Sequence, residues 1–474
     1  MTRTRKSLRW LGLLLLALLI VALGFGYTHY VRPMLRVATG YTAKMVCSEH
    51  FVAGFTVEQV LRDLPDNPLV PYLRVQVDEA NGLATATLWG WLEGQTAIYR
   101  PNLGCTLLAG PGPYATAPLE LPPAAAPNPD APWPYGEAST IRHTAAGSDI
   151  PALAQALERA FAEPDPARPR HTRAVLVVWR GQLVGERYAD GITPQTPLLG
   201  WSMTKSVTSA LVGIYLARQG IQVTDPAPAP EWRARPDDPR QAITWEHLLR
   251  MTSGLDFRED YADLRADVLQ MLYNTGDMGA YTARRPLAQP PGTWWNYTSG
   301  STNLLARLVR LGFGGDPEEL AAYWRFPYET LFWPLGMHTA VLEPDASGSW
   351  VGSSYMYASA RDWARFGLLY LQDGVWDGQQ ILPPGWVAFS TQVTAASGGE
   401  YGAHWWLNRG TADDPNARPW PDLPEDAFAA LGRDGQAVLV IPSREVVIVR
   451  LGLSRYDTWD LNELGRDVLE ALVK

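Results

Sequence analysis

A serine and a lysine three positions apart open a stretch whose pattern predicts a helix. After Ser202 the apolar residues recur at steps of three and four, at Val207, Ala210, Leu211, Ile214 and Ala217. This periodicity is typical of a helix, so Ser202 and Lys205 would share one face of its first turn. Free backbone N–H groups and the positive dipole end at a helix start stabilise an alkoxide and an oxyanion. Because a buried lysine can accept a serine proton, the pair predicts nucleophilic catalysis.

The composition of the chain favours this interpretation over an ordinary one. The ordinary interpretation is that Ser202 caps the helix and Lys205 is a solvated surface charge. Only four of the 40 Lys and Arg residues are lysine, at positions 6, 44, 205 and 474. Arginine cannot lose its proton, whereas lysine can. A chain that uses arginine for plain positive charge has therefore placed a titratable amine beside this serine.

Other kinds of chemistry have no signature in the sequence. There is no His-Glu-x-x-His zinc motif, no P-loop, no dinucleotide fingerprint and no Gly-x-Ser-x-Gly elbow. The seven histidines form no metal-ligand spacing. The net charge is −9 and no basic stripe is visible, which disfavours nucleic acid as a partner. We therefore expect a small-molecule substrate, with no metal and no cofactor.

Residues 1–33 predict a membrane anchor or a signal segment. Basic residues at positions 3, 5, 6 and 9 precede an uncharged run from Trp10 to Tyr27. That run is longer than the usual core of a cleaved signal and almost long enough to span a membrane. Since no small-x-small cleavage site follows closely, we prefer a retained anchor to a cleaved signal. The preceding positive charge predicts a single-pass inner-membrane protein with its catalytic domain in the periplasm, or an exported protein.

Residues 34–110 predict a small N-terminal module, and residues 111–136 a Pro/Ala-rich linker. A short helix is expected at 56–64, and a hairpin from strands at 73–78 and 83–89. Cys47 and Cys105 are the only cysteines. In an oxidising compartment they would form a disulfide, and the alternative is two buried free thiols.

Residues 137–474 predict an α+β domain. The expected strands lie near its two ends, at 174–179, 182–188, 403–407, 437–442 and 445–451, with terminal helices at 150–161 and 461–473. This arrangement predicts one antiparallel sheet, assembled from the two ends and flanked by helices, beside an inserted mainly helical subdomain. The cleft between the two parts is the expected site.

Five segments, in this order, resemble the penicillin-recognising serine hydrolases. They are Ser202-Met-Thr-Lys205, the stretch 247–255, the stretch 291–299, Pro334-Leu-Gly-Met337 and Gly432-Arg-Asp-Gly435-Gln436. The branch they most resemble is class C β-lactamase-like, with its esterases and 6-aminohexanoate-dimer hydrolases. Order and spacing agree over residues 150–474. The resemblance implies a β-lactamase/transpeptidase-like fold and a covalent acyl-enzyme.

The resemblance also implies roles for further residues. Tyr297 would share the base role with Lys205, because a nearby ammonium draws a phenol toward phenolate. The alternative is a core tyrosine beside two tryptophans. The backbone N–H groups of Ser202 and Gln436 would form the oxyanion hole, and Gly435 would let substrate lie close to the strand.

Two positions depart from the β-lactam-active members of the family. Ser299 stands where they carry asparagine, which puts an amide contact to an acylamino side chain in doubt. Arg433 stands where they carry lysine or histidine. On the edge strand it would present a fixed cation to an anionic substrate group, or it would be a solvated surface charge. Both departures favour an esterase or amidase. The alternatives are a β-lactamase, a D-amino-acid peptidase, or a catalytically silent binding or sensor protein on the same fold.

Overall fold

The computed structural model describes residues 2–64, 69–110, 115, 117–121, 128, 130–138, 150–411, 413–455 and 458–473. Much of the predicted 111–136 linker lies outside the described residues.

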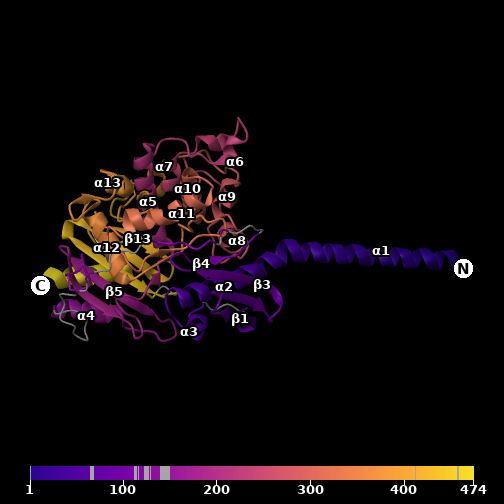
Figure 1. Cartoon of the computed structure of the whole chain (residues 1–474), viewed down its shortest axis with the longest axis horizontal. Helices are drawn as coiled ribbons and strands as arrows, with labels where there is room; N and C mark the ends of the chain where they lie inside the picture. The colour runs from indigo at the N-terminus through magenta and orange to yellow at the C-terminus, as the bar shows by residue number, and fades with distance from the viewer. Residues whose placement is uncertain are drawn as a thin grey trace.

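The chain begins with a long helical rod. It comprises α1 (Thr2–Gly26), a π-helical turn η1 (Tyr27–Val31) and α2 (Arg32–Phe51). Figure 1 shows α1 extending well away from the rest of the molecule. The stretch Leu13–Phe51 contains an exposed window long and apolar enough to cross a membrane, a test that a signal sequence also passes. The sequence did not predict the helix α2.

The expected hairpin lies in a four-stranded antiparallel sheet of order β1-β2-β3-β4. The strands are β1 (Leu73–Asp78), β2 (Leu83–Leu88), β3 (Leu92–Arg100) and β4 (Gly104–Leu107), preceded by α3 (Val57–Arg62) and a short turn η2 (Val70–Tyr72). The prediction of α3 and of the β1–β2 pair is confirmed, whereas β3 and β4 were not predicted. The expected disulfide is present and joins Cys47 of α2 to Cys105 of β4.

The main sheet is antiparallel and has the strand order β12-β13-β14-β15-β5-β6. Its strands are β5 (Thr172–Trp179), β6 (Gln182–Tyr188), β12 (Trp406–Leu407), β13 (Phe428–Gly432), β14 (Gln436–Ile441) and β15 (Val446–Gly452). The pairing of β15 with β5 joins the two ends of the domain, as predicted. The strand expected at 403–407 is reduced to its last two residues. The strand β13 was missed because its Ala-Ala-Leu-Gly sequence has low β-propensity.

Helices cover both faces of this sheet. On one face α4 (Pro151–Ala160) and α14 (Leu461–Val473) pack on alternate residues such as Val175 and Val177. On the other face α5 (Thr204–Gln219) and α12 (Ala360–Leu371) pack on the intervening residues such as Leu176 and Val178. The period-two alternation of a strand thus gives the sheet two apolar faces and the domain three layers.

The long segment between β6 and β12 is mainly helical. Its further helices are α6 (Pro230–Arg233), α7 (Trp245–Leu249), α8 (Asp267–Asn274), α9 (Met278–Ala283), α10 (Ser299–Phe313), α11 (Pro317–Pro327) and α13 (Trp386–Thr391). Its short strands are β7 (Leu198–Leu199), β8 (Val341–Leu342), β9 (Met356–Ala358), β10 (Val375–Trp376) and β11 (Gln379–Gln380). Its short 3-10 or π turns are η3 (Trp201–Met203), η4 (Pro239–Ala242), η5 (Tyr328–Phe332) and η6 (Ala395–Ser397). Two further 3-10 turns, η7 (Arg433–Gly435) and η8 (Pro442–Arg444), lie at the two ends of β14.

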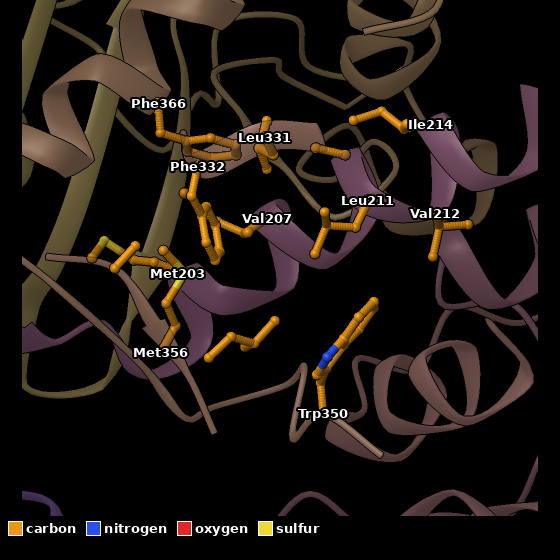
Figure 2. Close-up of a cluster of buried hydrophobic side chains, with 14 of the residues drawn as sticks. Met203, Val207, Leu211, Val212, Ile214, Leu331, Phe332, Trp350, Met356 and Phe366 are labelled. Carbon is orange, nitrogen blue, oxygen red and sulfur yellow. The ribbon is translucent and has the colours of Figure 1, made fainter. Parts of the chain in front are cut away.

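The helix α5 runs through the middle of the largest apolar core. Figure 2 shows Met203, Val207 and Leu211 pointing into a cluster with aromatic side chains from other elements. Every residue of α5 from Thr204 to Leu216 is buried. This packing fixes the position of the turn that carries Ser202.

The N-terminal module packs on the large domain through a shared core. That core includes Val46 and Cys47 of α2 together with Leu272 and Tyr355 of the large domain. Within the interface, the Lys44 ammonium pairs with the buried Glu343 carboxylate. Breaking such a buried pair by removing one partner is strongly destabilising, so the contact between the two parts depends on both residues.

Candidate active site

Ser202 lies in the tight turn η3, between β7 and the start of α5. Its neighbour Trp201 has a φ of 47°, a left-handed conformation that is strained for a bulky residue. A side chain at Gly200 would lie 2.3 Å from the Trp363 ring, so only glycine fits there. This left-handed turn, closely packed against Trp363, places Ser202 just before α5.

Lys205 is buried and its ammonium group contacts three oxygens. Its Nζ donates to Ser202 Oγ at 2.9 Å, Ser299 Oγ at 3.1 Å and the Ser353 carbonyl at 3.0 Å. Burial lowers the pKa of Lys205 to about 8, against the opposing influence of the Glu259 charge. The alternative of a solvated surface lysine is wrong. At mildly alkaline pH a large fraction of this amine is neutral and can accept the serine proton.

Tyr297 lies over the same serine and lysine. Its side chain is hydrogen-bonded to Ser202, and its ring centroid is 4.9 Å from Lys205 Nζ. Burial raises the pKa of Tyr297 above its ordinary value, and the hydrogen bond to Ser202 opposes this only in part. The expected pull toward phenolate is therefore outweighed by desolvation. The phenol is protonated in the resting site and suits a proton shuttle.

A carboxylate that the sequence analysis missed lies behind this pair. The Ser299 hydroxyl donates to Glu259 Oε1 at 2.5 Å, and the Ser299 backbone N–H donates to Oε2 at 2.8 Å. Tyr261 also donates to Oε1, at 2.9 Å. Glu259 thus reaches Lys205 through one serine hydroxyl. Its stretch, Arg-Glu-Asp-Tyr, looks like a charged surface loop, and the only sequence signal is its closeness to the 247–255 motif.

The Gly432–Gln436 segment was expected on an edge strand, but most of it forms a turn. Arg433 to Gly435 form the turn η7 between β13 and β14. Asp434 and Gly435 have φ values of 60° and 81°, the left-handed pair that closes a tight hairpin. Arg433 is about half exposed, and its guanidinium carbon lies 4.8 Å from the Tyr261 ring centroid. The cation is therefore on the Glu259 side of the site.

Gly435 and Gln436, which the sequence predicted to lie in the site, make structural contacts. Gly435 has a left-handed φ of 81°, and a side chain there would also lie 2.5 Å from the Arg450 guanidinium, so the turn favours glycine for structural reasons alone. The buried Gln436 side chain donates to the Gly452 carbonyl at 2.5 Å and accepts from its N–H at 2.9 Å. The strand β13 also passes close to the Ser202 turn. There a side chain at Gly432 would lie 2.2 Å from the Gly200 carbonyl.

Comparisons with known proteins point to one family. The family model described as Beta-lactamase matches residues 154–472. The 6-aminohexanoate-dimer hydrolase of Paenarthrobacter ureafaciens is 24% identical over 341 residues, 66% of this chain and 77% of that protein. A Bacillus anthracis structure described as a candidate 6-aminohexanoate-dimer hydrolase is 22% identical over 74% of this chain and 88% of its own, with a TM-score of 0.55. The hydrolase EstCE1 is described as having promiscuous acyltransferase activity. It is 16% identical over 69% of this chain and 99% of its own, with a TM-score of 0.51.

The region matched by the family model contains the serine, lysine and tyrosine that the structure brings together. At such identities the solved structures show the shared fold. The family match spans most of the chain and includes Ser202, Lys205 and Tyr297. The resemblance seen in the sequence is confirmed: the chain belongs to the β-lactamase family and is a serine hydrolase of that family.

Proposed function

We propose that the protein cleaves an ester or amide bond through a covalent acyl-enzyme on Ser202. The observation that carries this proposal is the contact of 2.9 Å between the buried Lys205 Nζ and Ser202 Oγ. The pKa of about 8 for this lysine makes the neutral amine available near physiological pH. A nucleophile in contact with a base that is itself held by further groups is the arrangement that covalent catalysis requires.

In acylation, neutral Lys205 removes the Ser202 proton while Oγ attacks the substrate carbonyl. The developing oxyanion is held by the Ser202 N–H and a second backbone N–H from the β13–β14 hairpin, for which Gln436 is the sequence-based candidate. The Tyr297 phenol, hydrogen-bonded to Ser202, donates a proton to the leaving group and is reprotonated by the Lys205 ammonium. In deacylation the same pair activates water, which releases the acyl group.

Ester and simple amide substrates suit the site better than β-lactams. Ser299 has no amide group to contact an acylamino side chain. Its hydroxyl is already hydrogen-bonded to both Lys205 and Glu259. Arg433 cannot donate a proton during turnover. The relatives named above are a 6-aminohexanoate-dimer hydrolase and an acyl-transferring hydrolase, which supports acyl transfer from an ester or amide. The intact contacts among serine, lysine and tyrosine argue against a catalytically silent sensor.

We also propose that α1 is a retained single-pass anchor in the inner membrane and that residues 137–474 form the periplasmic catalytic domain. The exposed apolar helix supports the anchor, and the Cys47–Cys105 disulfide supports an oxidising compartment. The small module 34–110 and the linker 111–136 would then lie between membrane and catalytic domain. Active alkaline phosphatase fused after residue 474 is the expected result. A soluble mature chain beginning after residue 27 would show a cleaved signal instead.

Labelling by a fluorophosphonate tests the hydrolase proposal. We expect one equivalent of adduct by intact mass, mapped to Ser202, and none in Ser202→Ala. Ser206→Ala is a matched control, because this nearby buried serine bonds the His404 carbonyl and takes no part in the chemistry. Labelling of a different serine, with Ser202→Ala still active, would overturn the proposal.

A further inference from the structure

A mainly apolar cavity of about 110 Å³ lies between the N-terminal module and the large domain, and the proposed chemistry does not use it. On the module side it is lined by Val37, Ala38 and Tyr41 of α2. On the opposite side it is lined by leucines at 264 and 269. A concave apolar pocket of this kind fits a hydrocarbon group rather than a polar one.

Three further lining residues connect the cavity to the proposed active site. Trp201 directly precedes Ser202 in the turn η3. Tyr261 donates to Glu259, which in turn accepts from the Ser299 hydroxyl beside Lys205. Arg433 stacks over the Tyr261 ring. The cavity is therefore lined by the residue that directly precedes Ser202 in the chain.

The cavity also lies close to the end of the apolar N-terminal run. Val37 follows Tyr27 by ten residues of nearly continuous helix, which is about 15 Å at 1.5 Å per residue. The Tyr27 hydroxyl and the Arg32 guanidinium both donate to Glu93 at the start of β3. The β2–β3 turn is thus held beside the end of the anchor.

That turn carries two exposed tryptophans. Trp89 is 53% exposed and Trp91 is 75% exposed, an unusual state for such large side chains. Tryptophan at the surface is enriched where a protein meets the lipid–water interface. The placement of both tryptophans beside the anchor indicates that this side of the module faces the membrane.

We infer that the cavity binds the hydrocarbon chain of an amphiphilic ester or amide taken from the lipid–water interface, with its carbonyl at Ser202. This inference rests on the proposed hydrolase function and names its substrate class. Each methylene that enters the cavity should raise kcat/KM about fourfold, until the cavity is full. The N-terminal module is then part of the substrate site.

A chain-length series on the full-length protein in nanodiscs tests this inference. The substrates are p-nitrophenyl esters from acetate to decanoate. Ala38→Phe fills the cavity from α2, and Leu264→Trp fills it from the opposite wall, so that one variant serves if the other fails to fold. Ala80→Phe adds the same ring at an exposed turn of the same module, outside the cavity.

The wild type and Ala80→Phe should prefer long chains. The filled variants should lose at least tenfold in the decanoate-to-acetate ratio of kcat/KM. A folded filled variant with the wild-type ratio would overturn the inference.

Direct binding separates failure of this inference from failure of the hydrolase proposal. If no variant hydrolyses any ester or takes the phosphonate label, the hydrolase proposal fails. Binding of dansylundecanoic acid, followed by fluorescence, still tests the cavity. Saturable binding to wild type and Ala80→Phe, with at least tenfold weaker binding to the filled variants, supports the inference. Equal binding by all four proteins contradicts it.

Discussion

Two buried lysines of this chain have the same burial and nearly the same surroundings, yet they suit opposite tasks. Lys44 and Lys205 are each 1% exposed. Each has its Nζ near a serine hydroxyl one helical turn away, at 2.8 Å and 2.9 Å respectively. Each also lies over a tyrosine ring. The difference is the third partner.

Lys44 meets a carboxylate directly, whereas Lys205 bonds neutral oxygens. Burial lowers the pKa of both amines, and the touching Glu343 carboxylate opposes this at Lys44. At Lys205 the nearest carboxylate, Glu259, is held off by the Ser299 hydroxyl. A buried lysine in direct contact with a carboxylate is a structural ion pair, while one that contacts only neutral acceptors can lose its proton.

The largest effect is expected from replacing Lys205. Because arginine keeps the charge but not the deprotonated state, Lys205→Arg should lose about a hundredfold or more in acylation rate, nearly as much as Lys205→Ala. The measurement is burst-phase acylation by an activated ester, with folding checked by circular dichroism. A structural lysine would tolerate arginine, so a folded variant with near wild-type acylation would contradict the base assignment.

The complementary change at Lys44 should act on stability. Lys44→Met leaves the Glu343 carboxylate buried without its partner, and should cost about 3–5 kcal/mol of unfolding free energy. Glu343→Gln in the same chain should recover much of the loss, because it removes the unpaired charge. Denaturant unfolding measures both. Acylation per folded molecule should stay near wild type, and a hundredfold loss there would erase the distinction between the two lysines.

A smaller effect is expected at the phenol. Since burial raises the Tyr297 pKa, we expect the phenol to act as a proton shuttle rather than as the principal base. Tyr297→Phe should therefore cost less acylation rate than the lysine replacements. The double variant with Lys205→Ala should be little worse than Lys205→Ala alone, because the two groups act as a unit. Additive losses would mean that the two act independently.

The smallest effect is a shift in pH dependence. The Glu259 charge raises the Lys205 pKa, so Glu259→Gln should lower it further. The rise of kcat/KM with pH reports the neutral base, and it should move to lower pH in this variant. Glu58→Gln, at an exposed carboxylate in α3, is the matched control. If the rise of kcat/KM moved to higher pH instead, the Glu259 charge would not be what raises the Lys205 pKa.

The sequence predicted what depends on local spacing and missed what depends on distant contacts. Ser202 and Lys205 lie one helical turn apart, so their contact followed from periodicity alone. Glu259 meets Ser299 across 40 residues, and Glu343 meets Lys44 across 299. No pattern in the chain links such positions.

Backbone conformation limited the prediction elsewhere. The Arg433 segment was expected on a strand, but an Asp-Gly pair in left-handed conformation makes it a turn. The sheet assembled from both chain ends was predictable, because β5, β14 and β15 are rich in Val, Ile and Leu. The alanine-rich β13 carries no such signal.

The most direct test of the account is the pKa of Lys205 itself. The chain has only four lysines, so NMR of protein labelled with ¹³Cε-lysine gives few signals, and Lys205→Arg identifies the one that matters. This signal should titrate with a midpoint of about 8, and the acylation rate should rise with the same midpoint. A Lys205 signal that keeps its ammonium shift to pH 10, while acylation already proceeds at pH 8, would contradict the claim that this lysine is the base.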